Sequence, residues 1–237
     1  MNPSILFDLI GAVELTASAA ITVALLSIGF GRSWTERAWL ASVLGAWFVL
    51  VVVFAATEIF SSRPGSLGVG GVGISVAVPL LILCVAVFRV PSLRSALEKV
   101  PLALLIGVNT VRLLGISFVL LYQMHRLPAP FAPVAGWGDI LVGLTALPVA
   151  WLAARGWERS RRVILLWNTA GLLDLVAAVG LGVASSPGPL RLITAEPGSG
   201  IMSTLPWLLI PGFLVPLLAT THLAVFYRLR GVQSRRP

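Results

Sequence analysis

Seven long apolar stretches follow one another along the chain, and the polar residues gather in the short segments between them. Each stretch has about 20–27 residues, so as a helix rising about 1.5 Å per residue it can cross a hydrocarbon core of about 30 Å. A helix is expected because lipid offers no hydrogen-bond partner to the backbone. The pattern predicts seven transmembrane helices over residues 5–31, 38–60, 67–90, 102–122, 134–154, 163–184 and 205–227.

Composition agrees with this pattern. Hydrophobic residues make up 57% of the chain and charged residues only 11%, whereas soluble proteins carry about a quarter charged residues. The seven stretches leave almost no sequence for a separate soluble domain. We therefore expect an all-α integral membrane protein, with a single seven-helix transmembrane domain over residues 1–237.

The basic residues predict the orientation in the membrane. The loops after the first, third and fifth stretches and the tail after the seventh hold 13 of the 17 lysines and arginines. Because such residues are retained in the cytoplasm, the amino terminus is predicted outside and the carboxy terminus inside. The net charge of +8 is then a topology signal rather than a nucleic-acid footprint. The expected location is a cell inner membrane, as a multi-pass protein.

Ionisable residues within the apolar stretches are the candidates for function, because each is costly in lipid unless it is paired. Counting along the stretches places Glu14, Arg112 and Asp174 near mid-membrane and Asp139 nearer the outer side. Asn109 shares a helical face with Arg112, and Asn168 enters the sixth stretch from another side.

These six residues form the predicted ligand- or ion-binding site: Glu14, Asn109, Arg112, Asp139, Asn168 and Asp174. One guanidinium cannot neutralise two carboxylates, so one carboxyl group is expected to hold a proton near neutral pH. The alternative is a structural ion pair that keeps the helices in register.

The last stretch carries two further signals. Pro211 and Pro216 should kink or locally open its helix, because proline removes a backbone donor. His222 is expected on the inner third of this stretch, either as a proton relay or as a hydrogen-bonded packing residue. The long connection 185–204 before it is predicted to fold over the outer mouth as a lid or to form a plain turn.

Several chemistries are set aside. With one cysteine and two histidines in the chain, neither a metal site nor a resident cofactor is expected. The glycines of 68–73 match a dinucleotide-binding pattern, but they open an apolar stretch with no preceding strand, so helix packing explains them better.

Three segments in the second half carry a family resemblance. They are Leu127–Asp139, Trp167–Asp174 and Pro211–Pro216 with His222. In these the chain resembles an uncharacterised group of predicted bacterial multi-span inner-membrane proteins. The resemblance implies a bacterial inner membrane and names no substrate, cofactor or catalytic residue.

Three functions remain open. The first is binding or translocation of a small solute, ion or proton through the buried Glu/Arg/Asp cluster. The second is a membrane-embedded enzyme acting on a lipid or quinone, which should show a lateral opening with the carboxylates facing it. The third is a non-catalytic subunit or sensor with a membrane protein partner, which should leave a charge facing the bilayer. The lipid bilayer is the expected partner in all three, and nucleic acid in none.

Overall fold

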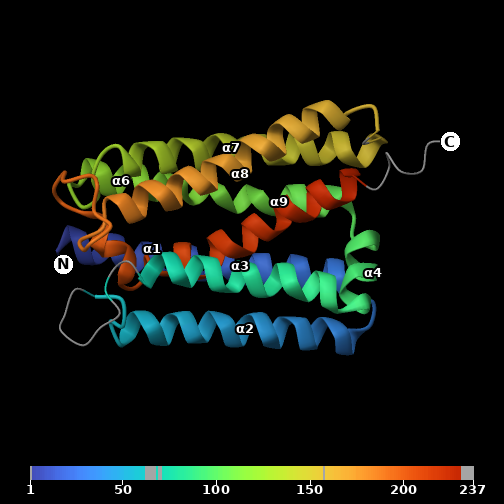
Figure 1. Cartoon of the computed structure of the whole chain (residues 1–237), viewed down its shortest axis with the longest axis horizontal. Coiled ribbons are helices and arrows are strands. Elements are labelled where there is room, and N and C mark those ends of the chain that lie inside the picture. The colour runs from blue at the N-terminus through green and yellow to red at the C-terminus, as the bar shows by residue number, and fades with distance from the viewer. Residues whose placement is uncertain (1, 62–67, 69–70, 157, 231–237) are drawn as a thin grey trace.

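The computed structural model describes residues 2–61, 68, 71–156 and 158–230, and its long helices run roughly along one common axis (Figure 1). Seven helices are long and apolar enough to cross a membrane, and the described residues contain no strand. These findings confirm the predicted all-α, seven-helix membrane fold. The bounds of the five continuous spans are α1 (Pro3–Phe30), α2 (Trp34–Ala56), α3 (Gly71–Arg89), α7 (Phe131–Gly156) and α8 (Arg161–Ala184).

Two spans are not uniform α-helices. The fourth joins α5 (Leu102–Gly107), a 3₁₀ segment η1 (Val108–Gly115) and α6 (Ile116–Gln123). The seventh joins a π-helical turn η3 (Ile210–Leu214) to α9 (Val215–Arg230). The π turn contains Pro211 and Gly212, so the predicted opening of this helix at Pro211 is present, and such turns are frequent at functional sites.

Several helices begin at residues other than the predicted ones. Ser33 caps α2 by accepting from the backbone N–H of Glu36 at 3.1 Å, so this helix begins before residue 38. α7 begins at Phe131 instead of residue 134, and the last span begins at Ile210 instead of 205. A short helix that the sequence pattern did not predict, α4 (Pro91–Lys99), follows α3. Residues 67, 69 and 70 of the third predicted span lie outside the described residues.

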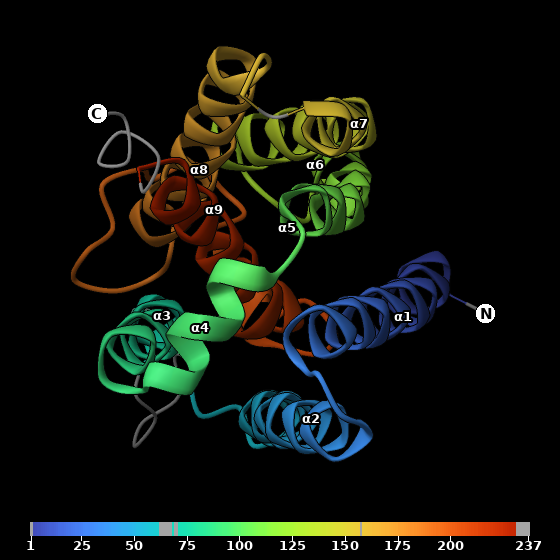
Figure 2. The ribbon, with the colours of Figure 1, turned by 90° about the vertical axis from the view of Figure 1, so that its right-hand side faces the viewer.

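The last span forms the centre of the bundle. Seen from one end, α9 lies between the group α5–α8 and the group α1–α3 (Figure 2). In the last span, 78% of the most apolar 18 residues are buried within the protein, compared with 11% in α2. The side chains of α9 therefore face protein rather than lipid, which suits a helix that carries polar residues.

The two ends of the bundle differ. We call the end that holds the start of α1 the amino-terminal end and the opposite end the α4 end (Figure 1). At the amino-terminal end Asp8 accepts two hydrogen bonds from Arg126, at 2.8 and 2.9 Å, and one from Trp207 Nε1 at 2.9 Å. This ion pair connects the start of α1 to the connections that follow α6 and precede η3.

Candidate functional site

Arg112, on η1, is the most connected polar side chain inside the bundle. Its side chain is 1% exposed. Its Nε donates to Asp139 Oδ1 of α7 at 2.6 Å, and its Nη2 donates to Asp174 Oδ2 of α8. Its Nη1 donates to the carbonyl oxygen of Gly171 at 3.0 Å and contacts Nε2 of His222 on α9 at 3.2 Å. We call Arg112, Asp139, Asp174 and His222 the Arg112 cluster.

The hydrogen bonds of His222 define its tautomer. Asn168 Nδ2 donates to the carbonyl oxygen of His222 at 3.0 Å, which leaves Asn168 Oδ1 facing His222 Nδ1 at 2.8 Å. An amide oxygen only accepts, so Nδ1 carries the proton. A guanidinium only donates, so Nε2 must be an acceptor for Arg112. His222 is therefore a neutral ring with both nitrogens engaged.

Glycines make this cluster sterically possible. A Cβ on Gly171 would lie 2.5 Å from His222 Cε1, and one on Gly138 would overlap the carboxylate of Asp174. A Cβ on Gly115 would lie 2.5 Å from the Cβ of Asp139. The backbones of η1, α7 and α8 thus approach closely at the depth of Arg112, as small residues allow between membrane helices.

The cluster carries an excess of negative charge. One guanidinium faces two carboxylates, and the hydrogen-bond geometry leaves the histidine ring neutral. The Asp139 and Asp174 side chains are 14% and 13% exposed, whereas that of Arg112 is 1% exposed. The cation is thus enclosed, while both anions keep a small accessible edge.

A small cavity adjoins the cluster. Arg112 and Asp139 line it, together with apolar residues of α1, η1, α8 and the seventh span, and its volume is about 30 Å³. That volume suits one or two water molecules, whereas pockets for organic ligands measure about 300–1,000 Å³. The space beside the cluster therefore fits water, a proton or a small ion.

Of the five other predicted site residues, four lie around Arg112 and one does not. Asn109 donates to Thr221 Oγ1 at 3.1 Å, next to His222 in the chain, and its own Oδ1 is buried without a partner among the described residues. Glu14 was expected to join Arg112 and Asp174, but its side chain is exposed on the outer surface of α1. Leu15 takes the inward place, because it lines the cavity beside Arg112.

His222 lies deeper than the sequence pattern placed it. The last span begins at Ile210, five residues later than predicted, so residue 222 falls near its middle instead of its inner third. Asp139 also lies deeper, since α7 begins at Phe131. Thr221 and the carbonyl oxygen of Gly171 were not among the predicted site residues. Thr221 lies beside His222 in the chain, but no sequence signal marks a backbone carbonyl as a partner for arginine.

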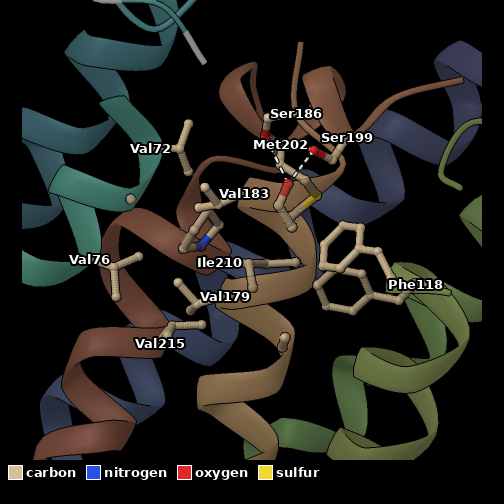
Figure 3. Close-up of a pocket in the computed structure, with 15 residues that line it drawn as sticks. Val72, Val76, Phe118, Val179, Val183, Ser186, Ser199, Met202, Ile210 and Val215 are labelled. Carbon is tan, nitrogen blue, oxygen red and sulfur yellow. Dashed lines mark hydrogen bonds between the residues drawn. The ribbon is translucent and has the colours of Figure 1, made fainter. Parts of the chain in front are cut away.

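A second, apolar cavity lies beside the first, toward the amino-terminal end. It lies between α3 and α8, with Val72 and Val76 on one side and Val179 and Val183 on the other (Figure 3). The two cavities share three lining residues: Phe118, Ile210 and Val215. On the same measure as the first cavity, its volume is about 50 Å³.

The predicted lid segment closes one side of this apolar cavity. Ser199 lies in the 3₁₀ turn Ser199–Ser203 and donates to the carbonyl oxygen of Gly182 at 2.6 Å, while Ser186 and Ser199 share a hydrogen bond of 2.8 Å (Figure 3). Met202 packs below them. This part of the long connection is thus attached to the end of α8.

Comparison with known families gives one match. The family described as "Domain of unknown function (DUF8737)" matches residues 69–230, and the chain therefore belongs to it. The matched region contains the whole Arg112 cluster and leaves out α1 and α2. No curated protein and no solved structure matches the chain significantly.

Proposed function

The chain belongs to a family of unknown function, so we propose its function from the geometry of the Arg112 cluster. We propose that it is a multi-pass protein of a bacterial inner membrane that binds a proton at this cluster and carries the proton across the bilayer. The single observation behind the proposal is a buried guanidinium held by two carboxylates and a neutral histidine beside a water-sized cavity. Buried ionisable residues in membrane spans commonly mark proton or ion pathways.

Charge balance favours a proton. With both carboxylates ionised the cluster has a net charge of −1 in a poorly polarisable environment, and one proton makes it neutral. A proton on either carboxyl group weakens that group's bond to Arg112 and leaves the guanidinium paired with the other. Either carboxylate can therefore take the proton while Arg112 stays paired with the other.

Cavity size and donor set argue against larger cargo. An amino acid or a sugar does not fit in about 30 Å³. Among the described residues, no three histidine, cysteine or acidic side chains are arranged to hold a metal ion. Asp139 and Asp174 are the proposed proton carriers, and His222 is a fixed acceptor for Arg112 instead of a relay.

Proton flux into vesicles tests the proposal. The purified protein is placed in vesicles that contain a pH-sensitive dye, and a potassium gradient with valinomycin sets the membrane potential. We expect acidification above that of empty vesicles, reduced at least tenfold in Asp139→Asn and Asp174→Asn. Asp8→Asn is the matched control, because Asp8 is also in an ion pair but lies outside the cluster. Wild-type flux equal to that of empty vesicles, or equal flux in all variants, would contradict the proposal.

The apolar cavity favours a second candidate, an enzyme or carrier for a lipid or quinone. Its lining between α3 and α8 suits a hydrocarbon chain, and it adjoins the polar cavity through Phe118. The carboxylates, however, do not line it. Binding of a long-chain lipid or quinone is compared in Val179→Trp and in the control Leu144→Trp, which lies on the exposed face of α7. Weaker binding in Val179→Trp alone would favour this candidate.

A further inference from the structure

The outer face of α1 carries a heptad seam. Residues spaced four and three apart along this face are all exposed, and we call them the α1 seam: Ile10, Glu14, Ala17, Ile21, Ala24 and Ile28. A strict alternation of four and three is the repeat by which two helices pack along each other in a left-handed coiled coil. Seen end-on, α1 lies at the edge of the bundle (Figure 2).

One member of the seam is a carboxyl group near mid-membrane. Glu14 lies eleven residues after the start of α1, about 16 Å along the helix. Its neighbour Leu15 lines the same cavity as Arg112, which also places Glu14 at the depth of the cluster. Within the part of the chain that the structure describes, Glu14 has neither a hydrogen-bond partner nor an ion-pair partner.

None of the residues that the structure describes offers a cation to Glu14 at this depth. Arg112 is the basic residue at mid-membrane among the described spans, and it is already paired with Asp139 and Asp174. A carboxyl group exposed to acyl chains is costly, and packing it against another helix removes that cost. A carboxylic acid both donates and accepts, so an identical carboxyl group complements it.

We propose that the protein forms a parallel dimer in the membrane through the α1 seam, with the two Glu14 carboxyl groups hydrogen-bonded across the twofold axis. Two copies inserted in the same orientation place each seam residue opposite itself, as twofold interfaces require. Ala17 and Ala24 let the backbones approach, and the isoleucines fill the spaces between them. A single polar position in a seam sets the register of the two helices.

Cysteine cross-linking tests the geometry. In a Cys84→Ala background, which removes the only native cysteine, Ala17→Cys and Ala24→Cys are treated in native-like vesicles with an oxidant. We expect at least fivefold more cross-linked dimer than with Thr16→Cys, exposed on another face of α1, or with Leu144→Cys on α7. Equal cross-linking at seam and control positions would overturn the proposal.

The role of Glu14 is tested by counting subunits. Single-molecule photobleaching in dilute vesicles gives the dimer fraction. We expect Glu14→Gln to dimerise nearly as well as wild type, since an amide also donates and accepts, and Glu14→Val to dimerise at least tenfold more weakly.

A monomeric wild type overturns the dimer, and equal dimer fractions in Glu14→Val and wild type overturn the carboxyl pair. Cross-linking of Ala17→Cys to a different polypeptide, in place of a second copy, also overturns the proposed dimer. None of these readouts depends on proton flux.

Discussion

Nη1 of Arg112 lies 3.2 Å from Nε2 of His222, so a permanent cation donates to a ring that is thereby held neutral. The same guanidinium holds two carboxylates, and the His222 ring is in turn fixed by Asn168. Residues from η1, α7, α8 and α9 are therefore tied into one network with Arg112 at its centre.

The first prediction concerns the tautomer of His222. Nitrogen NMR of the membrane-embedded protein should show Nδ1 protonated and Nε2 unprotonated, because Asn168 Oδ1 accepts from one and Arg112 donates to the other. The exposed His125 ring provides the internal comparison. In Asn168→Leu we expect loss of this single tautomer and a loss of about 1–3 kcal/mol in stability, since buried polar groups lose their partners. A doubly protonated His222 ring in the wild type would contradict the assignment.

The second prediction concerns the cost of removing the cation. Arg112→Met should destabilise the protein by about 3–5 kcal/mol, because two buried carboxylates lose their partner. The triple variant Arg112→Met, Asp139→Val, Asp174→Val should recover at least half of that loss, since no unpaired charge remains. Unfolding in mixed detergent micelles measures both. If the triple variant is no more stable than Arg112→Met, buried charge is not the cause of the instability.

The third prediction concerns close helix approach. Gly171→Ala should destabilise the protein by about 1–3 kcal/mol, because its Cβ would lie 2.5 Å from His222 Cε1 and 3.4 Å from Arg112 Nη1. Gly180→Ala, on the same helix α8, is the matched control, since a Cβ there meets nothing within 4 Å. We expect Gly180→Ala to leave stability unchanged or slightly raised, as alanine favours helix. Equal thermal midpoints for the two variants would argue against the packing described at the cluster.

The fourth prediction is a pH dependence outside the membrane. Arg191 Nη2 donates to Glu196 Oε1 at 2.6 Å in the connection between α8 and η3. This hydrogen bond and the charge of Arg191, with a smaller contribution from the Gly198 N–H, lower the pKa of Glu196 below its ordinary value. Because the folded pKa is the lower one, the contribution to stability is present above the unfolded pKa and disappears as the pH falls through the folded pKa.

Carbon NMR of the Glu196 carboxyl group checks this. In Arg191→Gln we expect the pKa of Glu196 to rise toward that of free glutamate, whereas Arg126→Gln, which breaks the separate pair with Asp8, should leave it unchanged. The effect on stability should be small, because Glu196 lies at the surface and water screens the pair. An unchanged Glu196 titration in Arg191→Gln would show that the ion pair does not form in solution.

Sequence alone was sufficient for the number and type of the spans, and for most of the polar site. Long apolar stretches can satisfy their backbones in lipid only as helices, so hydropathy and length determine them. Arg112, Asp139 and Asp174 were identified because a charge within such a stretch needs a partner, whatever the packing. Depth, too, follows from counting residues, as long as the ends of each helix are known.

Tertiary structure decided which face of each helix turns inward and where each helix begins. Glu14 and Leu15 are neighbours at one depth, yet packing of α1 turns Leu15 to the cavity and leaves Glu14 outside. His222 contacts Arg112, and the last span begins at Ile210 with a π turn, a boundary that no hydropathy profile registers. Counting along a chain gives depth, whereas rotation about a helix axis depends on the neighbours against which that helix packs. Only their assembly could therefore separate the buried cluster from the exposed carboxyl group.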